Sequence, residues 1–230
     1  MSIKNLALIV AAGDGTRMKK TLPKQYLSFR EKPVLLMVIE KFLENTNIDF
    51  VKVVISRNHL ARYSKVISNI SSKKLLPYEL GGETRAESVF KGLEGCKELF
   101  KNRHDKVLIH DAARPFISHS LINNLISKLK DSEAVFPTVP IHDALWYKIK
   151  NKYSTGPERQ YLHRAQTPQG FYFTQYKDLC KNFNNKHIDD ISIAQMHKLK
   201  ISSISGDPMN IKLTTPDDLK FAERIIQIWT

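Results

Sequence analysis

The feature that most restricts the fold of this chain is an alternation of short apolar runs with segments of helical periodicity. Short apolar runs of this kind are typical of strands buried in a parallel sheet. Strands are predicted at Leu6–Val10, Val51–Ile55, Val107–His110, Ala134–Thr138 and Lys200–Ile204. Helices are predicted over 33–43, 85–99, 118–129 and 215–229. This order predicts an α/β fold whose mostly parallel sheet carries helices on both faces.

Three of these helices begin at recognisable signals. Pro33 stands in the first turn of the first helix, where a missing N–H is tolerated. Ser118 is a favourable N-cap for the helix that follows it. Thr215 and Pro216, followed by two aspartates, mark the start of the last helix, because acidic residues are favoured in the first turn.

One stretch, from Pro140 to Pro157, interrupts the alternation. It is polar, it has no helical period, and it carries Trp146 and Tyr147 close to two lysines. An extended β-arm that projects from the domain and a long surface loop both fit this composition.

Composition excludes several classes of protein. With 230 residues, of which 42% are apolar, residues 1–230 are expected to form one domain. The apolar runs are too short to span a bilayer, and the N-terminal run is too short for a signal peptide. Cys96 and Cys180 are the only cysteines and have no metal-site spacing. We therefore expect a cytoplasmic protein without a disulfide, a zinc site or a membrane partner.

The net charge of +13 is spread along the chain. A scattered excess of lysine is typical of a solvated surface, whereas a nucleic-acid site needs a basic stripe or an aromatic platform. No nucleic-acid partner is expected. A basic nucleic-acid-binding protein without catalysis remains the alternative from another functional class.

The first candidate site follows the first strand. Two alanines and two glycines, Ala11, Ala12, Gly13 and Gly15, precede Arg17 and Lys24. Neither the dinucleotide-binding nor the P-loop motif is met, because Met18 stands where the former needs its third glycine. Small residues let backbone N–H groups approach an anion, and two cations suit a triphosphate. A glycine turn beside two surface cations is the alternative.

Two further candidate sites lie at the second glycine pair and at the end of a strand. Gly81 and Gly82 precede a helix that contains Ser88, and an ordinary capped connection is the alternative there. Asp111 ends the strand 107–110, at the edge where open α/β sheets bind ligands. A single carboxylate suits Mg²⁺, which shares oxygens with substrate phosphates. Arg114 could bind a phosphate, and His110 is interpreted as a packing residue.

Two polar stretches, 159–170 and 210–216, read alone as connections, and Asp189–Asp190 reads as a helix N-cap. Together with the three sites they form an ordered set of motifs: AAGxGxRM, PKQY, GGxxRxxSV, HDAARP, AQTPQGF and NIKLTTPxD. In this set the chain resembles the 2-C-methyl-D-erythritol 4-phosphate cytidylyltransferases, over residues 7–223. The sequence HRAQTPQGF, residues 163–171, is also similar to that of the cytidylyltransferase half of bifunctional enzymes of the same pathway.

The resemblance implies a Rossmann-like nucleotidyltransferase fold of the nucleotide-diphospho-sugar transferase type. A β-arm at about 138–163 would clasp a second subunit in a homodimer. The implied reaction transfers CMP from CTP to the polyol phosphate 2-C-methyl-D-erythritol 4-phosphate, with Mg²⁺, and releases pyrophosphate. Such a transfer depends on positioning and charge stabilisation, and it needs no covalent nucleophile or general base.

The family's functional residues are carried over by motif. Arg17 and Lys24 correspond to the residues that stabilise the transition state, and Arg159 and Lys212 to those that hold the acceptor phosphate. Asp111 falls near the metal and the acceptor, with Arg114 and Thr167 on the acceptor side. The expected nucleotide contacts are Ala11, Ala12, Gly13, Gly15, Gly82, Glu83, Ser88 and Ala112.

Four positions depart from the family pattern, one of them Ile188, which stands where a threonine usually opens the acidic pair Asp189–Asp190. Ala144 stands where a threonine is usual on the acceptor side, and Glu83 and Glu158 each replace an aspartate. The lost hydroxyl removes one hydrogen bond, worth about 0.5–1.5 kcal/mol. Ala144 therefore leaves open a related enzyme that uses another polyol phosphate, such as ribitol 5-phosphate.

Overall fold

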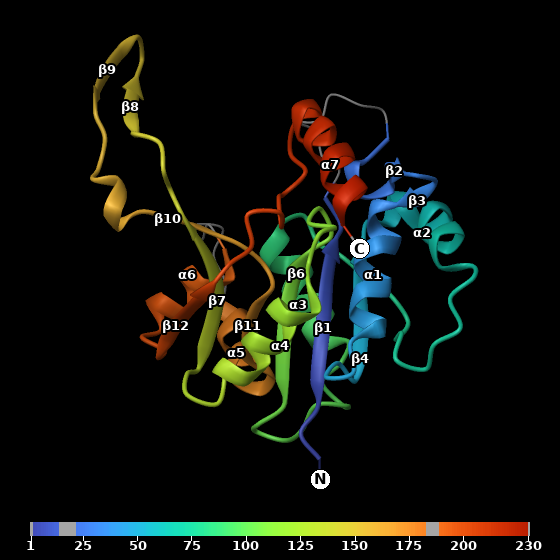
Figure 1. The fold of residues 1–230 in the computed structure, drawn as a ribbon. Helices are drawn as coiled ribbons and strands as arrows, with labels where there is room; N and C mark the ends of the chain where they lie inside the picture. Colours follow the sequence, from blue (N-terminus) through green and yellow to red (C-terminus); the bar gives the residue numbers. More distant parts are fainter. Residues whose placement is uncertain (1, 14–21, 183–188, 230) are drawn as a thin grey trace.

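A twisted sheet runs through the centre of the computed structural model, which describes residues 2–13, 22–182 and 189–229 (Figure 1). Within these residues the sheet has eight strands, in the order β10-β7-β11-β6-β1-β4-β5, with β12 paired to β7. The strands are β1 Asn5–Ala11, β4 Phe50–Ile55, β5 Glu79–Leu80, β6 Lys106–Asp111, β7 Ala134–Pro140, β10 His163–Ala165, β11 Gln169–Tyr172 and β12 Ile201–Ser205.

The mostly parallel character of the sheet is confirmed, and its antiparallel part lies on one side. β1 pairs in parallel with both β4 and β6, β4 with β5, and β7 with β12. β11 runs antiparallel between β6 and β7, and β10 runs antiparallel to β7. β10 and β11 were not predicted, because both strands are short and contain polar residues such as the buried Gln169.

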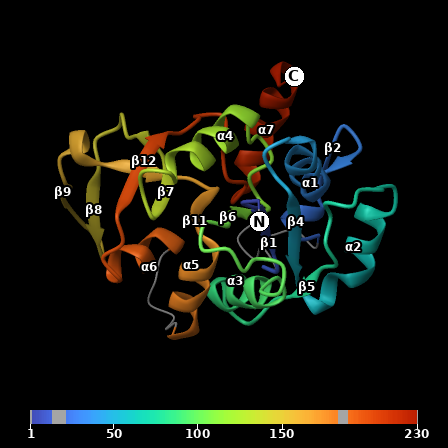
Figure 2. The ribbon, with the colours of Figure 1, turned by 90° about the horizontal axis from the view of Figure 1, so that it is seen from below.

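Helices cover both faces of the sheet, as the sequence predicts. α1, α2 and α4 lie on one side, and α3, α5 and α6 lie on the other (Figure 2). A large apolar cluster fills each interface. No helix in the described part of the chain is long and apolar enough to cross a membrane. The helices are α1 Val34–Glu44, α2 Leu60–Ile67, α3 Arg85–Glu94, α4 His119–Lys128, α5 Phe173–Leu179, α6 Asp190–Met196 and α7 Pro216–Ile228.

Most of the predicted helix starts are confirmed, and two helix boundaries are corrected. The Ser118 hydroxyl accepts from the backbone N–H of Leu121, and Asp189 caps α6. Pro33 has an extended backbone and is the N-cap of α1, whereas the sequence predicted it in the first turn. α3 ends at Glu94 rather than near 99 because the chain leaves the helix at its C-cap, Gly95, and turns toward the core.

α7 closes the structure beside the carboxyl ends of the central strands. Its N-terminus has a capping box between Thr215 and Asp218, with Pro216 at the first helical position as predicted. Ala222 packs into a small apolar cluster with Phe29, Phe116 and Leu213. This contact holds the segment that precedes α7 against the sheet edge, where Lys212 lies.

The segment between β7 and β10 is a projecting arm, one of the two alternatives that the sequence left open and the one that the family resemblance implies. β8 Trp146–Ile149 and β9 Lys152–Thr155 form an antiparallel hairpin that extends away from the sheet (Figure 1). All residues of both strands are exposed. The arm begins and ends where β7 and β10 pair, at Pro140 and His163.

The contact between α3 and the sheet generates a prediction at Gly92. A Cβ at this position would lie 2.6 Å from Leu8 Cδ1 and 2.7 Å from Val54 Cγ2. We expect Gly92→Ala to lower the free energy of unfolding by about 1–3 kcal/mol through overpacking. Alanine's better helix propensity, about 1 kcal/mol, opposes this loss only in part.

Urea unfolding followed by circular dichroism measures the change. Lys91→Ala is the control, because Lys91 is exposed on the same helix and its contacts, an ion pair with Glu87 and a 3.4 Å hydrogen bond to the carbonyl of Gly81, lie on the surface. Its effect should stay within about 0.5 kcal/mol. A Gly92→Ala protein at least as stable as wild type would contradict the packing argument.

Candidate active site

The candidate site lies where the direction of chain winding reverses. From β1 the chain passes to β4 and β5 on one side, and α3 then returns it to β6 on the other side of β1. Because β1, β4 and β6 are parallel, their carboxyl ends meet at one edge. Open α/β sheets bind ligands at such a switch point.

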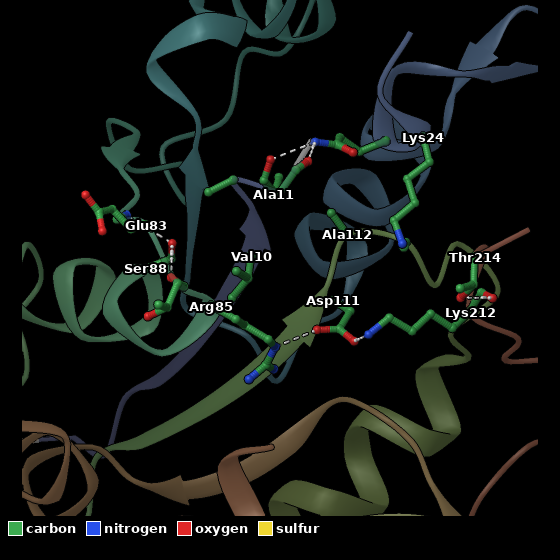
Figure 3. A pocket seen from close by; sticks show the side chains of 16 residues that line it. Val10, Ala11, Lys24, Glu83, Arg85, Ser88, Asp111, Ala112, Lys212 and Thr214 are labelled. Atoms are coloured by element: carbon green, nitrogen blue, oxygen red, sulfur yellow. Dashed lines mark hydrogen bonds and ion pairs between the residues drawn. The ribbon is translucent and has the colours of Figure 1, made fainter. Parts of the chain in front are cut away.

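A cavity opens at this edge, between the loops that follow β1, β5 and β6 and the segment before α7 (Figure 3). It brings together most of the residues predicted from the sequence. Those that line it are Ala11, Ala12, Gly13, Lys24, Gly82, Glu83, Ser88, Asp111, Ala112 and Lys212. Gly15 and Arg17 lie outside the described residues.

The loop after β1 is held by a side chain that sequence reasoning did not single out. Gln25 lies in the short 3₁₀ helix Lys24–Tyr26 and is 2% exposed. Its amide nitrogen donates to the carbonyls of Ala11, at 2.9 Å, and Gly13, at 2.8 Å. The neighbouring Lys24 is thereby fixed beside the loop. Gln25 could have been noticed in the sequence because it directly follows Lys24, a predicted site residue.

The loop before α3 is shaped by the helix that follows it. The Ser88 hydroxyl accepts from the backbone N–H of Gly82 and donates to the carbonyl of Thr84. A Cβ on Gly81 would lie 2.4 Å from that of Ala12, so only glycine allows the two loops to approach this closely. The backbones of both loops therefore face one cavity, as a site for an extended anion requires.

Asp111 is the central charged group of the cavity (Figure 3). Lys212 Nζ lies 2.6 Å from its Oδ2, and Arg85 Nε lies 3.1 Å from its Oδ1. Burial alone would raise the pKa of Asp111, but the charges of Arg85 and Lys212 hold it well below its usual value. The carboxylate is therefore ionised in neutral solution. Sequence reasoning missed Arg85 as its partner, because the two residues come from different elements.

His110 and Thr167 form a buried hydrogen-bonded pair that contacts the backbone of Asp111. Burial lowers the pKa of His110 to about 4, so the ring is neutral near pH 7. Its Nε2 faces the carbonyl of Arg114, which can only accept, so Nε2 carries the proton and Nδ1 accepts from the Thr167 hydroxyl. The same hydroxyl accepts from the backbone N–H of Asp111. The interpretation of His110 as a packing residue is confirmed.

Arg114 has a structural contact that the sequence did not predict, and it does not line the cavity. Its guanidinium donates to the carbonyl of Asn210 at 2.8 Å. The Asn210 amide in turn donates to the carbonyl of Thr167, and the Leu213 N–H donates to the carbonyl of Ala113. In this chain Arg114 and Thr167 therefore hold the segment that carries Lys212.

Arg159 is not brought to the cavity of its own chain. It lies in the short 3₁₀ helix Arg159–Tyr161 at the base of the arm, where it is exposed and donates to the carbonyl of His142. Ala144 also lies on the arm and is exposed. Two of the predicted acceptor-side residues, Arg159 and Ala144, therefore lie on the arm.

Asp111 is the described carboxylate best placed to bind a metal ion. The described residues contain no group of three or more histidine, cysteine, aspartate or glutamate side chains arranged for this purpose. Mg²⁺ needs few protein ligands when substrate phosphates supply oxygens. The ionised Asp111 faces the cavity and fits this mode, although it also holds Arg85 and Lys212.

Comparisons with known proteins agree with the motifs. Residues 5–228 match the family model of IspD, 2-C-methyl-D-erythritol 4-phosphate cytidylyltransferase. The enzyme of that name from Clostridioides difficile strain 630 is 36% identical over 225 residues, which cover 96% of this chain and 93% of the relative. A bifunctional enzyme IspD/IspF from Wolbachia pipientis wMel is 37% identical over 97% of this chain, which spans 56% of that protein.

A solved structure extends the agreement to the fold. The crystal structure of a 4-diphosphocytidyl-2C-methyl-D-erythritol synthase superposes with a TM-score of 0.84. It is 28% identical, and the match covers 98% of this chain and all of the other.

The clamp formed by Gln25 generates a prediction. Gln25→Met keeps the shape of the side chain but removes both donors, so the carbonyls of the buried Ala11 and of Gly13 lose a partner. We expect the free energy of unfolding to fall by about 1–3 kcal/mol, measured by urea titration. Gln160→Met is the control, because Gln160 is exposed and contacts only Glu158 on the surface. Equal stability of the two variants would contradict the clamp.

Proposed function

This chain belongs to the 2-C-methyl-D-erythritol 4-phosphate cytidylyltransferase family, and from that premise we propose that it transfers CMP from CTP to 2-C-methyl-D-erythritol 4-phosphate. The products are 4-diphosphocytidyl-2-C-methyl-D-erythritol and pyrophosphate, and the enzyme is a nucleotidyltransferase of isoprenoid precursor biosynthesis. The observation that carries this conclusion is the family match over residues 5–228.

The two glycine-containing loops bind the nucleotide in this proposal. The loop at Ala11–Gly13 takes the triphosphate, and the loop at Gly82 and Glu83 takes the nucleoside side. The support is geometric, since both loops present backbone to one cavity and are rigidly held by Gln25 and Ser88. Gly15 and Arg17 are assigned to the same nucleotide site from the sequence motif alone.

The reaction is an in-line substitution at phosphorus. A phosphate oxygen of the acceptor bonds to the α-phosphorus of CTP, the bond to the bridging oxygen breaks, and pyrophosphate leaves. Negative charge grows on the equatorial oxygens and on the leaving group. Lys24 and Lys212 line the cavity and can stabilise this charge. No base is required, because the acceptor phosphate is already ionised near pH 7.

We assign Mg²⁺ to Asp111 and the phosphates of CTP. When bound, the ion would neutralise phosphate charge and help to orient the triphosphate. The fit of one ionised carboxylate beside the triphosphate loop supports this assignment. Asp111 also forms an ion pair with Lys212. In this proposal Asp111 binds the phosphates through Mg²⁺, and Lys212 binds them directly.

We propose that the arm forms the interface of a homodimer. A two-stranded hairpin with no covered face is only marginally stable in water. Here it exposes Trp146 (61%) and Tyr153 (64%), large apolar side chains that a second copy would cover. Arg159 also lies outside its own chain's cavity, which supports its use in the cavity of a partner.

We place the enzyme in the cytoplasm, where buried thiols such as Cys96 and Cys180 stay reduced.

Pyrophosphate release tests the proposed reaction. The purified chain is given CTP, Mg²⁺ and either 2-C-methyl-D-erythritol 4-phosphate or ribitol 5-phosphate, and we expect release with the first. Lys24→Met should lower turnover by about 10²–10³-fold while circular dichroism shows an unchanged fold. Release with ribitol 5-phosphate alone would refute the acceptor assignment. Silence with both, in a folded protein, would refute the reaction.

The arm provides a second prediction. Replacing Trp146 and Tyr153 by alanine removes the apolar side chains that a partner would cover. We expect wild type to sediment at twice the mass of the 26.5 kDa chain and the double variant at the monomer mass with reduced turnover. Phe221→Ala on α7 is the control, because Phe221 is also a large exposed side chain at 58%. A dimer that survives the double substitution would contradict the role of the arm.

A further inference from the structure

Arg85 joins the cavity to a buried carboxylate that lies outside it. Its Nε contacts Asp111 at 3.1 Å, and its Nη2 lies 2.7 Å from Oδ2 of Asp190, at the start of α6. Asp190 does not line the cavity, and its side chain is 2% exposed. The Tyr176 hydroxyl donates to the other oxygen of Asp190 at 2.8 Å. A chain of four polar groups thus runs from α5 to the cavity.

The charge of Arg85 is already matched within the protein. A guanidinium is a planar fork, so Arg85 can hold two carboxylates at fixed angles, which a lysine could not do. Burial disfavours its charged form, but Asp190 and Asp111 raise the pKa of Arg85 above its usual value. Although Arg85 borders the cavity, its contacts are directed to these two aspartates.

The other partner of Asp111 has a second task. Lys212 Nζ contacts Oδ2 of Asp111 at 2.6 Å, and the proposed function assigns the same ammonium group to a substrate phosphate. An ammonium on a flexible stem can move between the two. Arg85, fixed by Asp190, remains on Oδ1 when Lys212 turns away.

We propose that Arg85, anchored on Asp190, is the positioning residue that keeps Oδ2 of Asp111 directed into the cavity when Lys212 engages substrate. This inference rests on the proposed function and adds to it two residues, Arg85 and Asp190, that act through Asp111. Arg85 is not a phosphate ligand in this account, and Asp190 affects turnover only through Arg85.

The test uses variants that keep the buried charges balanced. Arg85→Gln alone would leave the buried carboxylate of Asp190 without its cation and that of Asp111 with Lys212 alone, and it could fail to fold. The double variant Arg85→Gln/Asp190→Asn removes one charge of each sign and should fold. Asp190→Asn and Arg85→Lys are made alongside it. The control is Glu94→Gln, which weakens a part-buried ion pair with Lys177 at the other end of α3.

We expect the double variant to lose about 10–100-fold in kcat, the range typical of outer groups that orient a ligand. Asp190→Asn should lower kcat in the same direction, and Arg85→Lys should retain more activity than the double variant. CTP affinity measured calorimetrically in EDTA should equal that of wild type for all of them. Glu94→Gln should leave both quantities unchanged.

Three results would overturn the inference. A loss of CTP affinity in EDTA, parallel to the loss of kcat, would make Arg85 a direct phosphate ligand. An unchanged kcat in the folded double variant would make the network purely structural. A crystal structure of the double variant with 2-C-methyl-D-erythritol 4-phosphate bound gives the third result: an Asp111 carboxylate that keeps its wild-type orientation while Lys212 contacts the substrate would refute the positioning role. Failure of the proposed reaction is distinguished from these results, because in that case the wild-type protein itself would release no pyrophosphate.

Discussion

The parallel pairing of β1 with both β4 and β6 is the constraint on which the rest of the structure depends. The register sets Val10 beside Val54 on one side and beside Asp111 on the other. The three strands therefore end at the same level, and each delivers its following loop to one edge of the sheet. The cavity needs no special element of its own, because it is the space between these loops.

The sequence predicted the strands that build this edge because they are short, continuous apolar runs with small residues after them. It also predicted that Asp111 would lie at the edge, since this follows from strand direction alone. It did not predict β10 and β11, which are short and stabilised by pairing with long neighbours. Nor did it show that Arg159 lies away from its own cavity, because that depends on the path of the arm.

The polar contacts were the least predictable part of the site. The phosphate contact of Arg114 stays a prediction, whereas its hydrogen bond to the carbonyl of Asn210, almost a hundred residues later in the chain, was not predicted. Gln25 and Arg85 had no assigned role, although each adjoins or belongs to a quoted motif. Such contacts join elements that are distant in sequence, so their partners can be found only after the fold has brought them together.

The ion pair between Lys212 and Asp111 has a consequence for anion selectivity. An anion that recruits Lys212 must compensate for the loss of a close contact with the buried carboxylate of Asp111. A monovalent ion such as chloride supplies too little charge to do so, whereas a polyphosphate supplies several charges at once. We therefore expect a polyphosphate to compete for Lys212 more effectively than a monovalent anion does.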